Sequence, residues 1–174
     1  MYKNKNNKEI NKTYINNYIN EFYIPPSSLI KSNACIKYSL PSNSVYKKID
    51  LNELDNLIKQ AKERSFSHKL INYIDRKGVP DKVIYKKAFI DRKLFSKIKN
   101  KYDYKPSKNT VIAFILALEL NIEEANELLS SAGYSFSRSD YFDLIIMYFI
   151  NIKYYDITDI NDVLYDYKLN IIGY

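Results

Sequence analysis

Hydrophobic residues recur along most of the chain with the 3.6-residue period of an α-helix. The first such stretch, residues 9–23, predicts an amphipathic helix with one apolar face. Its apolar positions are Ile10, Tyr14, Ile15, Tyr18, Ile19 and Phe22. Pro25 and Pro26 stop this helix, because proline lacks an amide hydrogen and keeps the preceding residue out of helical angles. Residues 24–49, rich in Ser, Asn, Pro and Lys, are expected to form a linker or an extended arm.

A second series of helices begins near residue 50. Asp50 followed by Glu53 is a capping pattern that predicts a short helix over residues 50–62. Capping residues, prolines and glycines then divide residues 65–133 into five predicted helices, the last of which ends at Gly133. The residues that stand just before these five helices are Ser65, Pro80, Asp91, Ser107 and Asn121.

The C-terminal part of the pattern predicts two more helices, at about residues 139–151 and 158–167. Nothing in the chain alternates with period two over a useful length, so we expect an all-α fold. The chain then divides into three parts. Residues 1–64 form an N-terminal arm, residues 65–133 a helical domain, and residues 134–174 a C-terminal helical extension packed on that domain.

Charge is distributed unevenly along the chain. Residues 65–121 contain thirteen Lys and Arg against five Asp and Glu, a net charge of +8. Residues 122–174 contain three against nine, a net charge of −6. A basic helical centre followed by an acidic helical tail makes the molecule polarised. The overall net charge of +7 suits a nucleic-acid partner.

The residue types that usually carry catalysis are scarce. The chain has one His, His68, and one Cys, Cys35, so neither an internal disulfide nor a zinc site is expected. We find no nucleophile elbow and no glycine-rich phosphate loop, and we expect no catalytic residue, cofactor or metal. Because no secretory signal and no apolar run of membrane-spanning length are present, we expect a cytoplasmic protein without membrane contact.

The order and spacing of the central helices carry a resemblance. Residues 105–107, Lys-Pro-Ser, stand before an apolar helix, and Ala117 and Leu118 stand near the end of that helix. Four apolar residues fall where they would pack two short helices together: Ile84, Ile90, Phe95 and Ile98. In these features residues 65–130 resemble the helix-turn-helix domain of phage-repressor-like bacterial regulators, the Cro and xenobiotic-response-element group. Residues 65–174 also look like a C-terminal domain of diverse bacterial proteins, some of them fused to macro domains.

The first resemblance implies a five-helix, lambda-repressor-like bundle in which residues 91–100 are the recognition helix. The N-terminal residues of such a helix enter the major groove of double-stranded DNA. The residues expected to face DNA are Arg92, Lys93, Ser96, Lys97 and Asn100. The residues expected to neutralise phosphates are Lys82, Lys86, Lys99, Lys101, Lys105 and Lys108. The implied function is that of a non-enzymatic DNA-binding regulator of transcription, whose affinity falls as salt rises.

Three residues differ from the pattern of that family. Tyr85 stands where the second helix usually has a small residue, and Leu94 stands where the third usually has a small polar one. Phe89 replaces the glycine of the turn, where a left-handed backbone strains an aromatic residue. These differences favour an alternative function, a protein-interaction module on the same scaffold. An antitoxin, a phage anti-defence inhibitor and an adaptor are examples.

The sequence does not decide what covers two apolar surfaces. The apolar stripe of the N-terminal helix would dock on a partner protein or pack against the tail of its own chain, and the apolar tail helices would suit a homodimer. The acidic residues of the tail lack the glycine turn and final Glu of a calcium loop, so we interpret them as helix caps and a solvated acidic face. They are Asp140, Asp143, Asp156, Asp159, Asp162 and Asp166.

Overall fold

The computed structural model describes residues 2–3, 9–10, 12–25, 55–56, 58–59, 65–101 and 103–173. Within these residues the fold is all-α, as predicted, apart from a two-residue antiparallel pairing of β1 (Tyr2–Lys3) with β2 (Glu9–Ile10). Eight helices have defined bounds in this part of the chain. They are α1 (Lys12–Phe22), α3 (Phe66–Lys77), α4 (Asp81–Lys87), α5 (Arg92–Asn100), α6 (Lys108–Ala117), α7 (Ile122–Ser131), α8 (Tyr141–Asn151) and α9 (Ile157–Asp166).

The starts of four central helices follow the predicted caps. Ser65 accepts a hydrogen bond from the amide of His68, and Ser107 accepts one from the amide of Thr110. Asp91 caps α5, and Asn121 forms a complete capping box with its partner three residues on. Each cap satisfies amides that the first turn of a helix leaves without a partner.

Several predicted bounds shift by a few residues. The N-terminal helix begins at Lys12 rather than at residue 9, because residues 9–10 pair as a strand. Helix α6 ends at Ala117, because Glu119 takes a left-handed φ of 53° that ends the helical hydrogen bonds. Residues 55–56 and 58–59 are helical, as expected for the short helix at 50–62. The rest of that helix, the linker beyond residue 25, and Cys35 lie outside the described residues.

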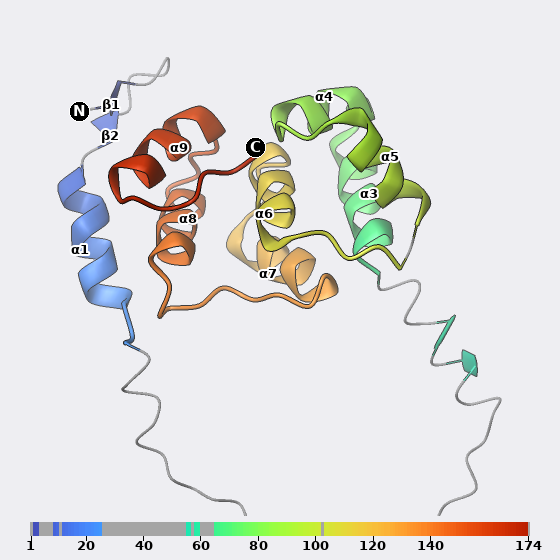
Figure 1. Ribbon diagram of the computed structural model, residues 1–174, viewed down its shortest axis with the longest axis horizontal. Helices are drawn as coiled ribbons and strands as arrows, with labels where there is room; N and C mark the ends of the chain where they lie inside the picture. Colours follow the sequence, from blue (N-terminus) through green and yellow to red (C-terminus); the bar gives the residue numbers. More distant parts are fainter. Residues whose placement is uncertain are drawn as a thin grey trace, which may run out of the picture.

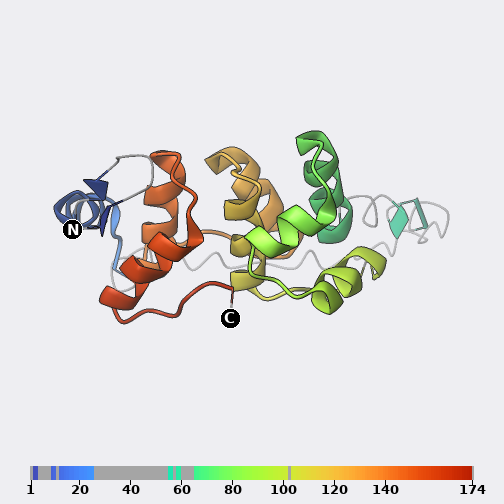
Figure 2. The ribbon, with the colours of Figure 1, turned by 90° about the horizontal axis from the view of Figure 1, so that it is seen from above.

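The helices form a row with α6 near its centre (Figure 1). At one end α1 lies beside α8 and α9, the middle is formed by α6 and α7, and α3, α4 and α5 form the other end (Figure 2). Every residue from Val111 to Leu118 is buried, which explains why this helix is apolar on all sides. No helix in the described part of the chain is long and apolar enough to cross a membrane.

The N-terminal helix packs against the tail of its own chain, which decides between the two alternatives for its apolar stripe. Ile15 and Ile19 are 1% and 6% exposed and lie on the face that meets α8. The side-chain amide of Asn151 donates to the Tyr18 hydroxyl at 3.0 Å, and the amide of Ile24 donates to the Arg138 carbonyl at 2.8 Å. Most apolar residues of α8 are therefore buried within the chain, whereas Tyr141 on α8 and Tyr165 on α9 are exposed, and the homodimer through the tail stays a prediction.

Candidate nucleic-acid interface

Helix α5 has one buried face and one exposed cationic face. Phe95 and Ile98 are 4% and 0% exposed and anchor the helix to the core, where the Phe95 ring lies 6.1 Å from that of Phe114. The cap residue Asp91 accepts the amides of Lys93 and Leu94 through one carboxylate oxygen. With the buried residues and this cap fixing the rotation of the helix, its exposed residues are Arg92, Lys93, Ser96, Lys97, Lys99 and Asn100. All five residues that the sequence assigned to base contacts are among them, together with Lys99, which was assigned to phosphate.

The turn between α4 and α5 has the left-handed residue that the resemblance requires. Phe89 has a φ of 53°, and its amide donates to the Lys86 carbonyl at 3.1 Å. The next amide, of Ile90, donates to the Tyr85 carbonyl at 2.8 Å, which completes a Schellman ending of α4. The ring of Tyr85 lies 5.4 Å from that of Phe95, so the bulky residue fills the space between the two helices.

Five of the six expected phosphate ligands are exposed, but they are not equally available. Lys82, Lys86 and Lys101 are exposed on α4 and just after α5. Lys99 pairs with Asp81 at 2.7 Å, a contact that ties α5 to the first turn of α4. The ammonium of Lys105 lies 5.2 Å from the centre of the Tyr134 ring and that of Lys97 4.5 Å from the Tyr104 ring, and both lysines are exposed. Such surface contacts hold a side chain weakly.

Lys108 is the sixth expected ligand, and the structure places it elsewhere. Its ammonium lies 2.5 Å from Oδ2 of Asp143, which is fully buried and also accepts the amide of Ser137 at 2.7 Å. Our prediction of a solvated Asp143 is wrong for the same reason, since the two residues pair across α6 and α8. Burial raises the pKa of the Asp143 carboxyl, while the bond from Lys108 lowers it and the charge of Asp140 raises it. Asp140 and Asp156 are helix caps, as predicted.

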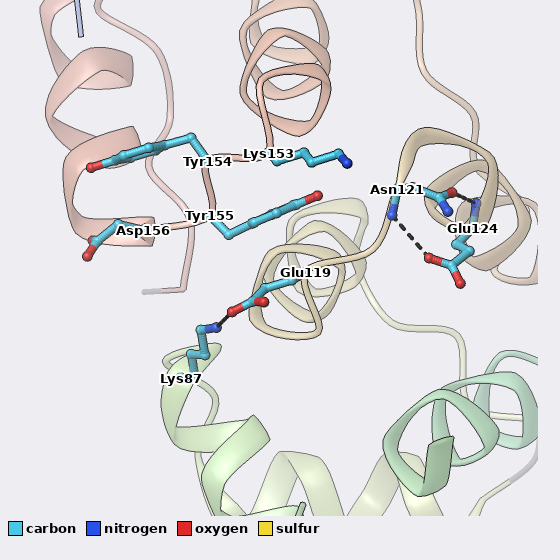
Figure 3. A pocket seen from close by; sticks show the side chains of 8 residues that line it. All are labelled: Lys87, Glu119, Asn121, Glu124, Lys153, Tyr154, Tyr155 and Asp156. Carbon is cyan, nitrogen blue, oxygen red and sulfur yellow. Dashed lines mark hydrogen bonds and ion pairs between the residues drawn. The ribbon is translucent and has the colours of Figure 1, made fainter. Parts of the chain in front are cut away.

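A pocket of about 630 Å³ lies where the end of α4 meets the α6–α7 and α8–α9 turns (Figure 3). Lys87 and Glu119 point toward one another across it at 2.5 Å, and this bond lowers the pKa of Glu119. Other lining groups are also engaged: Tyr155 donates to the Leu120 carbonyl at 3.2 Å, and Asp156 caps α9. These lining groups therefore connect the ends of neighbouring helices, and we assign no ligand to the pocket.

Comparison with known proteins finds no match, whether with protein-family models, curated proteins or solved structures. The geometry of the chain itself must therefore support any functional conclusion.

Sequence reasoning missed two features near the candidate interface. One is the ion pair between Lys87 and Glu119, two exposed residues 32 positions apart for which the sequence has no local signal. The other is the approach of Gly173 to the α4–α5 turn. An isolated glycine so far from that turn in sequence indicates a special backbone position, but not its neighbour.

Proposed function

We propose that the chain is a non-enzymatic, DNA-binding regulatory protein of the helix-turn-helix type, with α5 as its recognition helix. The observation that supports this most directly is the exposed face of α5. Arg92 and Lys93 lie in its first turn and Ser96 one turn later, while the opposite face is anchored in the core. Arg can donate two hydrogen bonds to a guanine edge, and Asn100 can pair in the same way with adenine.

The flanking lysines would supply affinity without reading sequence. Lys82 and Lys86 on α4, with Lys101 and Lys105 after α5, are exposed on the elements that border the recognition helix. Lys99 and Lys108 are left out of this set, because they are paired with Asp81 and Asp143. With the charges of Arg92 and Lys93 included, about six cationic side chains would displace counterions from the DNA, which predicts a log–log slope of affinity against salt of about −5.

A fluorescence-anisotropy titration of duplex DNA over a range of salt concentrations tests the proposal. The double variant Arg92→Glu/Lys93→Glu should lose most of the affinity and should reduce the salt slope by about 2. The matched control is Lys12→Glu/Lys153→Glu, which makes the same change in net charge at exposed positions on α1 and in the turn after α8. Negligible affinity of the unsubstituted protein at low salt would refute the proposal, and so would equal losses in the two double variants.

One observation favours a second function, that of a protein-interaction module such as an antitoxin, an inhibitor or an adaptor. Val83 on α4 and Phe89 in the turn are 50% and 43% exposed, so two apolar side chains lie at the surface of elements that carry the basic residues. This function predicts that Val83→Glu abolishes a defined complex with the product of a neighbouring gene, measured by light scattering after co-expression. It also predicts no salt-dependent affinity for DNA.

A further inference from the structure

The C-terminal segment returns from α9 to the helix-turn-helix. After Asp166 the chain turns at Lys168, whose φ is 57°, and the amide of Leu169 donates to the Leu164 carbonyl at 3.0 Å. The segment then crosses toward α6 and ends beside α4, where Figure 1 marks the C-terminus. Residues 168–173 thus connect the acidic end of the row with the basic end.

One buried residue anchors this segment. Ile172 is 0% exposed, and the side-chain amide of Asn161 on α9 holds its backbone at both polar groups. Oδ1 of Asn161 accepts the amide of Ile172 at 2.8 Å, and Nδ2 donates to the carbonyl at 3.0 Å. Two hydrogen bonds from one side chain fix the position and direction of an otherwise irregular stretch of backbone.

The next residue, Gly173, lies directly against the α4–α5 turn. A Cβ atom at this position would lie 2.7 Å from Cβ of Phe89 and 3.1 Å from the carbonyl oxygen of Ala88. Its φ of +83° is also in the region where side chains are strained. Both the space and the backbone angle therefore require glycine, and the contact brings the C-terminal segment to the one strained residue of the turn.

Phe89 has a φ of 53° without the conformational freedom of glycine. A left-handed backbone at an aromatic residue persists only where the surroundings hold it. The turn sets the direction of α5 relative to α4, because Ile90 and the cap Asp91 follow Phe89 immediately. A contact that holds Phe89 in place consequently holds the first turn of α5, where Arg92 and Lys93 lie.

We infer that residues 168–173 are a splint for the helix-turn-helix, in which Gly173 packs on Phe89 and keeps the recognition helix at the angle that fits DNA. This inference rests on the proposed function for its readout in DNA binding. The contact itself has a readout that does not involve DNA. Gly173 is a positioning residue in this arrangement, because it acts on DNA only through the turn.

Gly173→Ala tests the splint, and Gly78→Ala is its matched control. Gly78 has a similar φ of +63°, but a Cβ there meets nothing within 4 Å, so alanine brings strain without a clash. The background variant Phe89→Gly removes the nearest atom that the new Cβ would strike and leaves the Ala88 carbonyl oxygen at 3.1 Å. It also gives the turn a residue that needs no support. Affinity for duplex DNA is measured well below the lowest melting temperature of the set, so that every variant is folded.

The splint predicts that Gly173→Ala weakens DNA binding about tenfold, the loss expected when one base contact is misplaced. Gly78→Ala should stay within about twofold of the unsubstituted protein, since a tenfold change already needs about 1.4 kcal/mol. In the Phe89→Gly background, Gly173→Ala should weaken binding much less, because the closest clash is gone. A purely structural tail would lower the melting temperature of Gly173→Ala but leave the affinity of the folded protein unchanged, and that result would overturn the inference.

Hydrogen exchange at the amide of Ile90, which bonds the Tyr85 carbonyl, gives the readout without DNA. Gly173→Ala should speed this exchange, and Gly78→Ala should not. In the Phe89→Gly background, Gly173→Ala should speed it much less. If the unsubstituted protein does not bind DNA, the proposed function fails, and the exchange rate still decides whether the splint exists. Equal exchange in the unsubstituted protein, Gly173→Ala and Gly78→Ala would show that the C-terminal segment does not hold the turn.

Discussion

Replacement of Lys108 by Met should destabilise the protein strongly, because it leaves Asp143 as an unpaired buried carboxylate. Asp143 is 0% exposed, and its Oδ1 has no hydrogen-bond partner in the described residues. Without Lys108, the amide of Ser137 would be the remaining donor to Oδ2. Removing one partner of a buried ion pair costs about 3 kcal/mol or more. For a chain of this size the melting temperature should fall by roughly 6–12 °C near neutral pH.

The pKa shift of Asp143 decides how this loss of stability depends on pH. Burial raises the pKa of Asp143 above its ordinary value of 3.8, so the native state holds this proton more tightly than the unfolded chain does. The contribution of the protonated carboxyl to the free energy of unfolding is therefore full below 3.8 and is lost as pH rises through the folded pKa. Without the bond and the charge of Lys108, the pKa rises further, and the loss extends to higher pH.

The deficit of Lys108→Met relative to the unsubstituted protein should thus be largest near neutral pH and should shrink as pH falls toward about 4. Urea unfolding followed by circular dichroism at several pH values measures it. The two proteins differ only at residue 108, so the difference between them isolates the Lys108–Asp143 pair. The double variant Lys108→Met/Asp143→Asn should recover part of the loss, because an amide can be buried without charge. A deficit that does not change with pH, or no deficit at all, would refute this account of the pair.

Three further substitutions test the local structure. Lys153→Gly should raise the free energy of unfolding by about 0.5–1 kcal/mol in urea titrations, because Lys153 is exposed at a φ of 56° that glycine adopts without strain; a loss of stability would contradict this. Asn121→Ala should cost about 1 kcal/mol by removing the capping box of α7, and Asn121→Asp, which keeps the accepting oxygen, should cost much less. Ile15→Ala should cost about 2–4 kcal/mol, with hydrogen exchange in α1 and α8 accelerated more than in α3; uniform acceleration would show that α1 does not unfold locally.

Much of the fold follows from signals that lie within four residues of one another. Ser65, Asp91, Ser107 and Asn121 cap helices in the structure as the sequence predicts, because a cap needs only its own oxygen and an amide two or three residues on. The buried face of α5 is equally local, since the helical period alone separates Phe95 and Ile98 from the charged positions. The central helices and the exposed residues of the candidate interface could therefore be predicted.

Contacts between distant parts of the chain could not be predicted in this way. Lys108 and Asp143 each have an ordinary local interpretation, as a surface lysine and as an acidic residue in the first turn of a helix. Only the packing of α6 and α8 makes them partners, and the one sequence signal is that Asp143 stands between Phe142 and Leu144 in an apolar run. The position of α1 on α8 is a similar case, because an apolar stripe predicts burial without naming the surface that buries it.

The turns of this chain show how a sequence with 3 Gly builds left-handed helix endings. Phe89, Glu119, Lys153 and Lys168 all have φ between 53° and 57°, and in each case the following amide bonds the carbonyl five residues before it. That following residue is always apolar: Ile90, Leu120, Tyr154 or Leu169. Packing of this residue on its own helix stabilises the Schellman ending and offsets the strain that glycine would avoid. At three of these turns the left-handed residue is polar and can point to solvent, whereas Phe89 is aromatic, which is why this turn gains most from an additional contact such as that of Gly173.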